Sequence, residues 1–221
     1  MLLDHVSAES AARLVEVRLY LQLIDNVSLT PRGFTRELTS AKGLFFVHLY
    51  GTYEYTVTAA VQESLRHINQ GKSKIVDCHP VFLSMALDPE CRSLVDVGPD
   101  KTWDRRRVLF RRINSSEEVA VAETLMPTSG GNPKYEHLCS IWETFCIREP
   151  VVPRPLLIGR IKELVDSRNA IAHGRESASA VGSRFTPAEL HTRYADISEV
   201  CSHVIQAFEN CLDNKHYLMG T

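Results

Sequence analysis

The sequence contains no long hydrophobic run. None of the apolar stretches in its 221 residues approaches the roughly 18 residues that a membrane-spanning helix requires. Asp4, Glu9 and Arg13 stand within the first turns, where a secretory signal carries apolar residues. We therefore expect a cytoplasmic protein with no membrane partner.

Metal-binding and disulfide patterns are also missing. The cysteines form no CxxC pair and no disulfide-dense spacing. The stretches Asp77-Cys78-His79 and Cys201-Ser202-His203 each offer two metal ligands, but neither has a second pair at zinc-site spacing. We expect mostly buried thiols and no metal site. The six cysteines are Cys78, Cys91, Cys139, Cys146, Cys201 and Cys211.

The overall charge does not indicate binding of nucleic acid, and the glycine pattern does not indicate a bound cofactor. The net charge is −2 and the pI is about 6.5, so an anionic partner has to be held by a local patch. The chain has no phosphate-cradling glycine loop, no dinucleotide fingerprint and no serine nucleophile motif. With 44% hydrophobic and 24% charged residues, the composition is that of a globular domain, alone or with an insertion.

Helical periodicity dominates what is present. Apolar residues at helical spacing predict strong helices over 7–26, 40–69 and 155–173, and a short helix over 134–147. A last helix begins after Thr186, a natural N-cap that Glu189 completes as a capping box. Its core positions alternate in steps of four and three, at Leu190, Tyr194, Ile197, Cys201, Val204, Phe208 and Cys211. We expect an all-α bundle.

The middle of the chain, residues 71–133, has no sustained period and is expected to be an irregular insertion. Prolines and glycines interrupt residues 71–100, in which 81–87 fits a short helix. Residues 101–126 fit a helix and a strand equally well, and 127–133 are a loop by composition.

Two charges fall on the apolar faces of the best-defined helices. In the helix over 155–173, Arg168 lies in the stripe that contains Ile161, Leu164 and Val165. In the helix over 40–69, Glu54 lies in the stripe that contains Tyr50. Each charge needs a partner, because burying either alone costs several kcal/mol. We expect Glu54 and Arg168 to meet, either as a structural ion pair or as support for a site.

The end of the 155–173 helix carries groups suited to phosphodiester chemistry. The guanidinium of Arg168 binds phosphate, and the imidazole of His173 exchanges protons at neutral pH. The two residues are about 140° apart around the helix axis, so they converge poorly on one phosphate. Either His173 swings away where Gly174 ends the helix, or two chains pair to form a composite cleft. We favour a homodimer, through the apolar stripe around Arg168.

The stretch Arg168-Asn-Ala-Ile-Ala-His173 resembles the R-N-x-x-x-H signature of HEPN domains, and Leu49-Tyr-Gly-Thr-Tyr-Glu54 resembles the "LY…E" helix of HEPN families from bacterial defence and toxin operons. The resemblance covers about 40–70 and 155–213. It implies one HEPN-like domain over residues 1–221, forming an all-α homodimer with the two motifs in a shared cleft.

The resemblance also implies an activity and residue roles. Active HEPN proteins are metal-independent endoribonucleases, in which the RNA 2′-hydroxyl attacks the adjacent phosphate and leaves a 2′,3′-cyclic phosphate. By position, Arg168 stabilises the phosphorane, His173 acts as acid or base, and Asn169 orients one of them or the phosphate. The implied role is that of a toxin or antiviral defence effector under an antitoxin or regulatory protein. Toxins silenced by a nucleotidyltransferase antitoxin often carry tyrosine where this chain has Arg175.

The alternative interpretation is a catalytically inactive HEPN module that binds a nucleotide or a protein partner. In it, Arg168 and Glu54 only hold the core, and His173 only caps a helix end.

A basic stretch lies outside the motifs. Residues 103–113 contain five arginines, which form either a solvated face of the insertion or an RNA-binding strip. The candidate RNA-binding residues, with the arginine that follows the motif, are Arg105, Arg106, Arg107, Arg111, Arg112 and Arg175. Tyr50, Tyr53 and His137 are interpreted as packing or satisfied side chains, although a tyrosine beside the cleft can stack on a base.

Overall fold

The structure is a computed structural model that describes residues 2–28, 35–95, 97–128 and 132–220. The predicted all-α class is confirmed. The elements, in chain order, are α1 (Asp4–Ser28), α2 (Thr35–Gln70), the 3-10 helix η1 (Ile75–Asp77), α3 (Leu83–Ala86), α4 (Asp88–Arg92), α5 (Pro99–Ile113), α6 (Tyr135–Thr144), α7 (Leu156–Ala172), α8 (Ala178–Gly182) and α9 (Pro187–Asp213). Across these ranges, no helix is both long and apolar enough to cross a bilayer.

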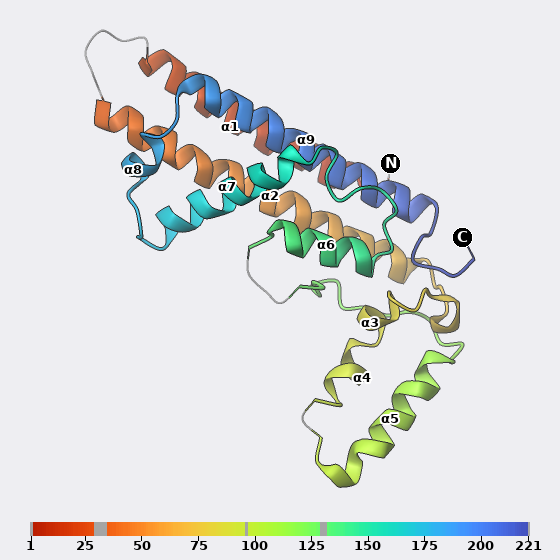
Figure 1. Ribbon diagram of the computed structural model, residues 1–221. Coiled ribbons are helices and arrows are strands. Elements are labelled where there is room, and N and C mark those ends of the chain that lie inside the picture. The colour runs from red at the N-terminus through yellow and green to blue at the C-terminus, as the bar shows by residue number, and fades with distance from the viewer. Residues whose placement is uncertain (1, 29–34, 96, 129–131, 221) are drawn as a thin grey trace.

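The centre of the bundle is α2, which contacts α1, α7, α8 and α9. Figure 1 shows α1, α2 and α9 lying along one another, with α6 and α7 on the other side of α2. Because α2 has neighbours on more than one side, it buries Leu49, Thr52 and Tyr53 in addition to the stripe read from the sequence.

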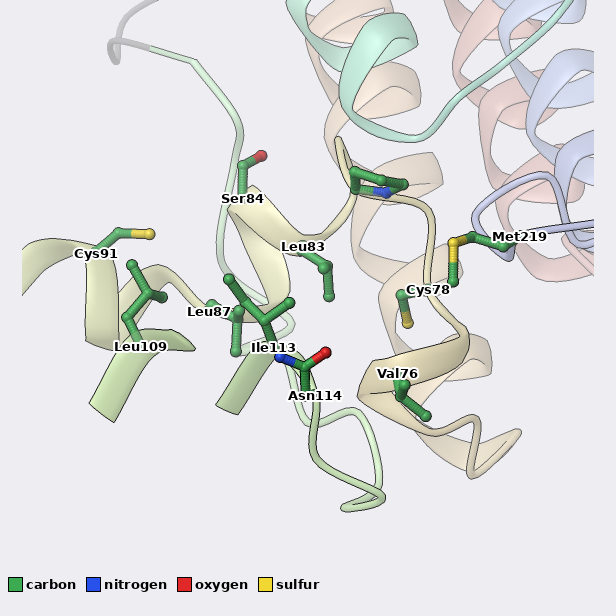
Figure 2. Close-up of a pocket in the computed structure, with 11 residues that line it drawn as sticks. Val76, Cys78, Leu83, Ser84, Leu87, Cys91, Leu109, Ile113, Asn114 and Met219 are labelled. Atoms are coloured by element: carbon green, nitrogen blue, oxygen red, sulfur yellow. The ribbon is translucent and has the colours of Figure 1, made fainter. Parts of the chain in front are cut away.

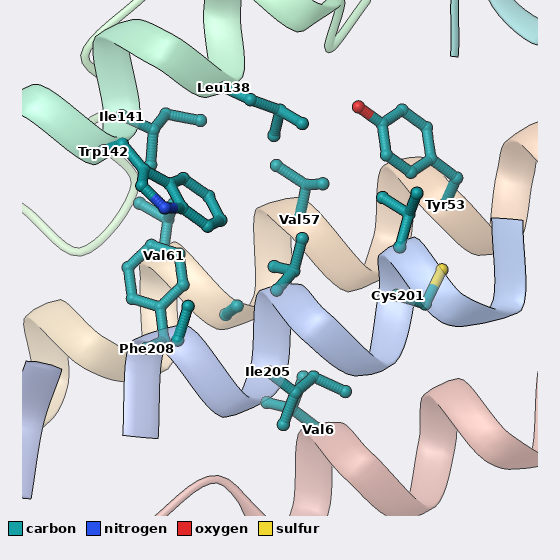
Figure 3. Packing of buried hydrophobic residues seen from close by; sticks show 14 of the residues in the cluster. Val6, Tyr53, Val57, Val61, Leu138, Ile141, Trp142, Cys201, Ile205 and Phe208 are labelled. Atoms are coloured by element: carbon teal, nitrogen blue, oxygen red, sulfur yellow. The ribbon is translucent and has the colours of Figure 1, made fainter. Parts of the chain in front are cut away.

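The core joins α2 to α9 and α6. Figure 3 shows Val57 and Val61 of α2 packed beside Phe208 of α9 and Trp142 of α6. The rings of Trp142 and Phe208 meet edge to face, with centroids 5.8 Å apart, a favourable aromatic geometry. The predicted seam of the last helix is buried, from Leu190 to Cys211, apart from a half-buried Tyr194.

A capping box begins α9, and ion pairs join α9 to α7. The backbone N–H of Glu189 donates to Thr186 Oγ1 at 3.3 Å, and the N–H of Thr186 donates to Glu189 Oε2 at 2.8 Å, so the predicted capping box is present. Asp196 of α9 is buried and accepts from Arg160 Nε of α7 at 2.9 Å and from Arg154 Nη2 at 3.2 Å. The sequence patterns gave no indication of this buried carboxylate, whose partners offset its desolvation.

Two glycines let α8 approach α2 closely. A Cβ added to Gly43 would lie 1.9 Å from the carbonyl oxygen of Ala178, and one added to Gly182 would lie 1.9 Å from that of Thr39. Neither contact leaves room for a side chain, since both clash with backbone atoms. The close approach holds down the segment that follows the end of α7.

The middle segment contains short helices rather than irregular chain throughout. Residues 99–113 form α5, which packs against η1 and α4 and projects from one end of the bundle (Figure 1). The ambiguity over 101–126 is therefore resolved as helix up to Ile113, followed by extended chain that forms an isolated bridge between Glu118 and Lys74. Of the loop predicted over 127–133, residues 129–131 lie outside the described residues.

Candidate functional site

Arg168 is half-buried on α7, where it faces α2. Its guanidinium carbon lies 4.5 Å from the centre of the Tyr50 ring, within cation–π distance. Its Nη1 donates to Asn169 Oδ1 at 2.8 Å and to Asn132 Oδ1 at 3.1 Å. The ring and the two amides hold the guanidinium in one orientation.

The rest of the guanidinium is available to a ligand. Arginine has five N–H donors, and the described contacts use only those of Nη1. Among the residues that the structure describes, none accepts from Nε or Nη2 of Arg168, and neither atom is among the buried polar atoms without a partner. These two nitrogens thus keep their N–H donors free of acceptors in the described ranges, in the planar arrangement that matches a phosphate.

The predicted contact between Glu54 and Arg168 is wrong. Within the described ranges, no ion pair of 4.0 Å or less joins them. Instead, the hydroxyl of Tyr50 lies 2.7 Å from Glu54 Oε1 and 2.9 Å from Asn132 Oδ1. Tyr50 precedes Glu54 by one helical turn, and its side chain occupies the space between Glu54 and Arg168. The guanidinium of Arg168 lies over the Tyr50 ring, and the carboxylate of Glu54 contacts the Tyr50 hydroxyl.

The hydroxyl of Tyr50 remains protonated at neutral pH. Burial, and then the hydrogen bond to Glu54, raise the pKa of Tyr50 well above its ordinary value of 10.0, and the positive charge of Arg168 offsets only part of this rise. A hydroxyl has one proton, so Tyr50 donates to Glu54 or to Asn132 at any moment. The carboxylate is the stronger acceptor and is also closer.

Asn132 is a site residue that the sequence did not reveal. Its Nδ2 donates to Asn169 Oδ1 at 2.6 Å, while its Oδ1 accepts from Arg168. Because Asn169 Oδ1 receives two donors, the amide of Asn169 is fixed, and its Nδ2 has no acceptor in the described part of the chain. The only signal at Asn132 was its place in a Gly-Asn-Pro loop, and loop composition says nothing about distant contacts.

His173 stands apart from this cluster. It follows the last residue of α7 as its C-cap, and Gly174 continues with a φ of +67°, the left-handed conformation predicted to end the helix. The imidazole is exposed, and no described residue hydrogen-bonds it. One chain thus joins Arg168 to Asn169, while helix geometry leaves His173 about 140° from Arg168 and about 40° from Asn169 around the axis.

A comparison with family models identifies the fold. The model described as MAE_28990-like HEPN matches residues 2–217. This chain belongs to the HEPN superfamily. Neither the curated proteins nor the solved structures contain a match to it.

The HEPN match includes both helices that carry the motifs, α2 and α7, and also residues 71–133, on which the resemblance of the motifs gave little information. The arginine–asparagine pair that the HEPN signature singles out is the pair that the structure joins through Arg168 Nη1.

The arginines of α5 lie outside the HEPN motif site, since α5 projects from the end of the bundle away from the C-terminal end of α7 (Figure 1). Arg107 is paired with Asp104, and the Arg106 guanidinium lies 5.0 Å from the Trp103 ring. Exposed arginines are Arg105, Arg106, Arg107 and Arg111 on α5, and Arg175 after the motif. Arg112 is half-buried and paired with Glu90 and Glu117.

The surface cavities differ in the polarity of the residues that line them. A cavity of about 420 Å³ between η1, α3 and α5 is lined almost entirely by apolar groups such as Leu83, Leu87 and Ile113 (Figure 2). It offers little to a phosphate. A cavity of about 160 Å³ is lined by Glu54 and His137, and one of about 260 Å³ lies between α6 and α7. The smaller of these two is lined by Glu54, and the larger by Val165 and Asp166, which precede Arg168 on α7.

Proposed function

We propose that this HEPN protein is a metal-independent endoribonuclease that acts as a toxin or antiviral defence effector. The observation that carries the proposal is that Arg168 Nε and Nη2, and Nδ2 of the adjacent Asn169, have no acceptor among the described residues. Oriented N–H donors with no protein acceptor are suited to binding a phosphate and the negative charge that develops on it.

In the proposed reaction, the 2′-oxygen of RNA attacks the adjacent phosphorus, and the bond to the 5′-oxygen of the next nucleotide breaks. The products are a 2′,3′-cyclic phosphate and a 5′-hydroxyl. Arg168 stabilises the charge on the phosphorane, and Asn169 orients the phosphate. His173 removes the proton from the 2′-hydroxyl or supplies one to the leaving oxygen. Glu54 acts through Tyr50, whose ring supports the guanidinium.

The separation of Arg168 and His173 supports a composite site in a homodimer. The apolar stripe of α7 cannot form the interface suggested by the sequence, because Ile161, Leu164 and Val165 are buried inside the chain. We propose instead that two copies meet through the exposed C-terminal end of α7, so that His173 of each copy faces the phosphate held by Arg168 of the other. An antitoxin or regulatory protein would then act by covering this cleft.

RNA cleavage in EDTA tests the proposal. We expect wild-type protein to cleave RNA without a metal ion and to leave cyclic phosphate ends. His173→Ala is expected to lower the rate at least 100-fold, since general acid–base catalysis contributes about 10²–10⁴-fold. His5→Ala, at an exposed histidine of α1, is the matched control and should keep full activity. Equal cleavage by wild type and His173→Ala would assign the activity to another site or to a contaminant.

The alternative is an inactive HEPN module that binds a nucleotide or a protein partner. One observation favours it: in the single chain, the imidazole of His173 makes no hydrogen bond to the Arg168 cluster or to any other described residue. Sedimentation tests the composite nuclease, which requires a dimer, so a protein that stays monomeric would contradict it. A folded dimer that cleaves none of several RNAs would favour the binding module.

A further inference from the structure

A mixed pocket lies between the first turn of α6 and one face of α7. Its volume is about 260 Å³, below the roughly 300–1,000 Å³ typical of pockets for drug-sized molecules, so it suits a single ring system. Its floor is Val165, which is buried, and Ile158, which packs against the core. The remaining lining residues are Lys134, Tyr135, Glu136, Lys162 and Asp166.

Two features of the chain place the pocket close to the proposed phosphate site. Along α7, Lys162, Asp166, Asn169 and His173 follow at steps of four, three and four, and therefore share one face of the helix. From the other side, Lys134 is two residues after Asn132, whose Nδ2 donates to Asn169 Oδ1 at 2.6 Å. Asp166, which lines the pocket, and Asn169 are thus about one helical turn apart along α7, roughly 5 Å.

The groups around the pocket match a nucleobase. An apolar floor and the ring of Tyr135 suit the flat faces of a base, which stack on aromatic side chains in RNA recognition. The charged lining residues are exposed and offer hydrogen-bond donors and acceptors to the polar edge of a base; they are Lys134, Glu136, Lys162 and Asp166. Lys162 is paired with Asp166 at 2.6 Å, whereas the carboxylate of Glu136 has no cation within 4.0 Å in the described part of the chain.

The geometry points to a nucleobase subsite in this pocket, holding the base of the nucleotide next to the phosphate bound by Arg168 and Asn169. The inference rests on the proposed RNA substrate. The carboxylate of Glu136, which forms no ion pair within the described ranges, accepts the paired N–H donors on the Watson–Crick edge of guanine, and Lys134 donates to the carbonyl oxygen of the base. Guanine is therefore the base that the pocket favours.

Binding of the four ribonucleoside 5′-monophosphates to the full chain tests the subsite without requiring cleavage. Ribose 5-phosphate, which has the phosphate and no base, is the reference. We expect guanosine monophosphate to bind at least tenfold more tightly than ribose 5-phosphate. Tyr135→Leu keeps apolar packing and removes the stacking ring, and should weaken the guanosine nucleotide about tenfold.

A pair of charge variants on α6 checks the edge contacts. Glu136→Gln should remove most of the preference for guanine, whereas Glu143→Gln, at an exposed glutamate of the same helix, should leave it unchanged. Equal binding of guanosine monophosphate and ribose 5-phosphate, or equal binding by wild type and Tyr135→Leu, would overturn the subsite.

The outcome is separable from that of the nuclease proposal. Base-dependent binding that is lost in Tyr135→Leu, in a protein that cleaves no RNA, would support the subsite and count against the nuclease. Cleavage of RNA with no base preference and no nucleotide binding in the pocket would support the nuclease and count against the subsite.

Discussion

The side chain of Tyr50 connects residues from three separate parts of the chain. It lies within hydrogen-bond distance of Glu54 on its own helix and of Asn132, while its ring supports the guanidinium of Arg168. A neutral phenol is well placed for this role, because it carries a proton for the carboxylate and an electron-rich face for the cation. Glu54 therefore influences Arg168 through Tyr50 and not by direct pairing.

A double-mutant cycle tests this connection. Tyr50→Phe keeps the ring and removes the hydroxyl, and should lower the free energy of unfolding by about 1–2 kcal/mol, the loss expected for a partly buried hydrogen bond to a charged group. Glu54→Gln should lower it in the wild type and change it much less in Tyr50→Phe. Urea unfolding of all four proteins measures the coupling.

Tyr20→Phe is the matched control for that cycle. Its hydroxyl is also half-buried and donates to the carbonyl oxygen of Ala41 at 3.2 Å, away from Glu54. Its effect should add to that of Glu54→Gln. Additive effects for Tyr50→Phe as well would show that Tyr50 and Glu54 act independently.

Among the helices, α8 is short, but its contact with α2 is close. α7 ends at Ala172 and the chain turns at Gly174, after which α8 lies against the N-terminal half of α2, where Gly43 and Gly182 face backbone atoms. The side chains of Thr39 and Ser179 add a hydrogen bond of 2.7 Å. This contact fixes the chain that follows His173, and so limits where the end of α7 lies.

Two alanine substitutions in α2 distinguish the effect of this contact on stability from the effect of helix propensity. Gly43→Ala should destabilise the protein by about 2 kcal/mol, because the new methyl group overlaps the carbonyl of Ala178. Gly51→Ala, in the same helix with nothing within 4 Å of the added methyl, should stabilise it by about 0.5–1 kcal/mol. Thermal or urea unfolding measures both. A stabilising Gly43→Ala would mean that α8 does not lie where the structure has it.

The molecule as a whole buries several weakly acidic groups. Burial raises the pKa of the Cys201 thiol and of the Cys211 thiol from 9.0 to about 12 in each case. Burial likewise raises the pKa of Tyr53 well above 10.0. These groups ionise more readily in the unfolded chain, so the folded state holds their protons more tightly. Their contribution to stability is complete below about pH 9 and is lost as the pH rises toward 12.

The bundle is therefore expected to weaken in alkali. From pH 7 to pH 10, the two thiols alone should lower the free energy of unfolding by roughly 2–3 kcal/mol. Cys201→Ala should reduce this pH-dependent fall by about 1 kcal/mol, whatever its effect on stability at pH 7. Urea unfolding under reducing conditions at both pH values measures the change. An identical fall in wild type and Cys201→Ala would contradict the assignment to this thiol.

Patterns between near neighbours in the chain determined the helices and part of the site. The spacing of apolar residues predicted α2, α7 and α9, and local chemistry predicted the Thr186 cap and the turn at Gly174. The pair Arg168 and Asn169 was evident for the same reason, since adjacent residues on one helix stay close in any fold. These features depend on helix geometry, which the sequence specifies locally.

Only the tertiary structure decided what surrounds Arg168. Its contact with Asn132 joins residues 36 apart, and that of Tyr50 with Asn132 joins residues 82 apart. The sequence projection placed Glu54 and Arg168 on facing stripes, yet it could not show that Tyr50 fills the space between them. It also suggested that the stripe of α7 was open to a second chain, whereas α2 covers it. Periodicity identifies which face of a helix is buried, but the partner of that face is set by how all the helices pack together.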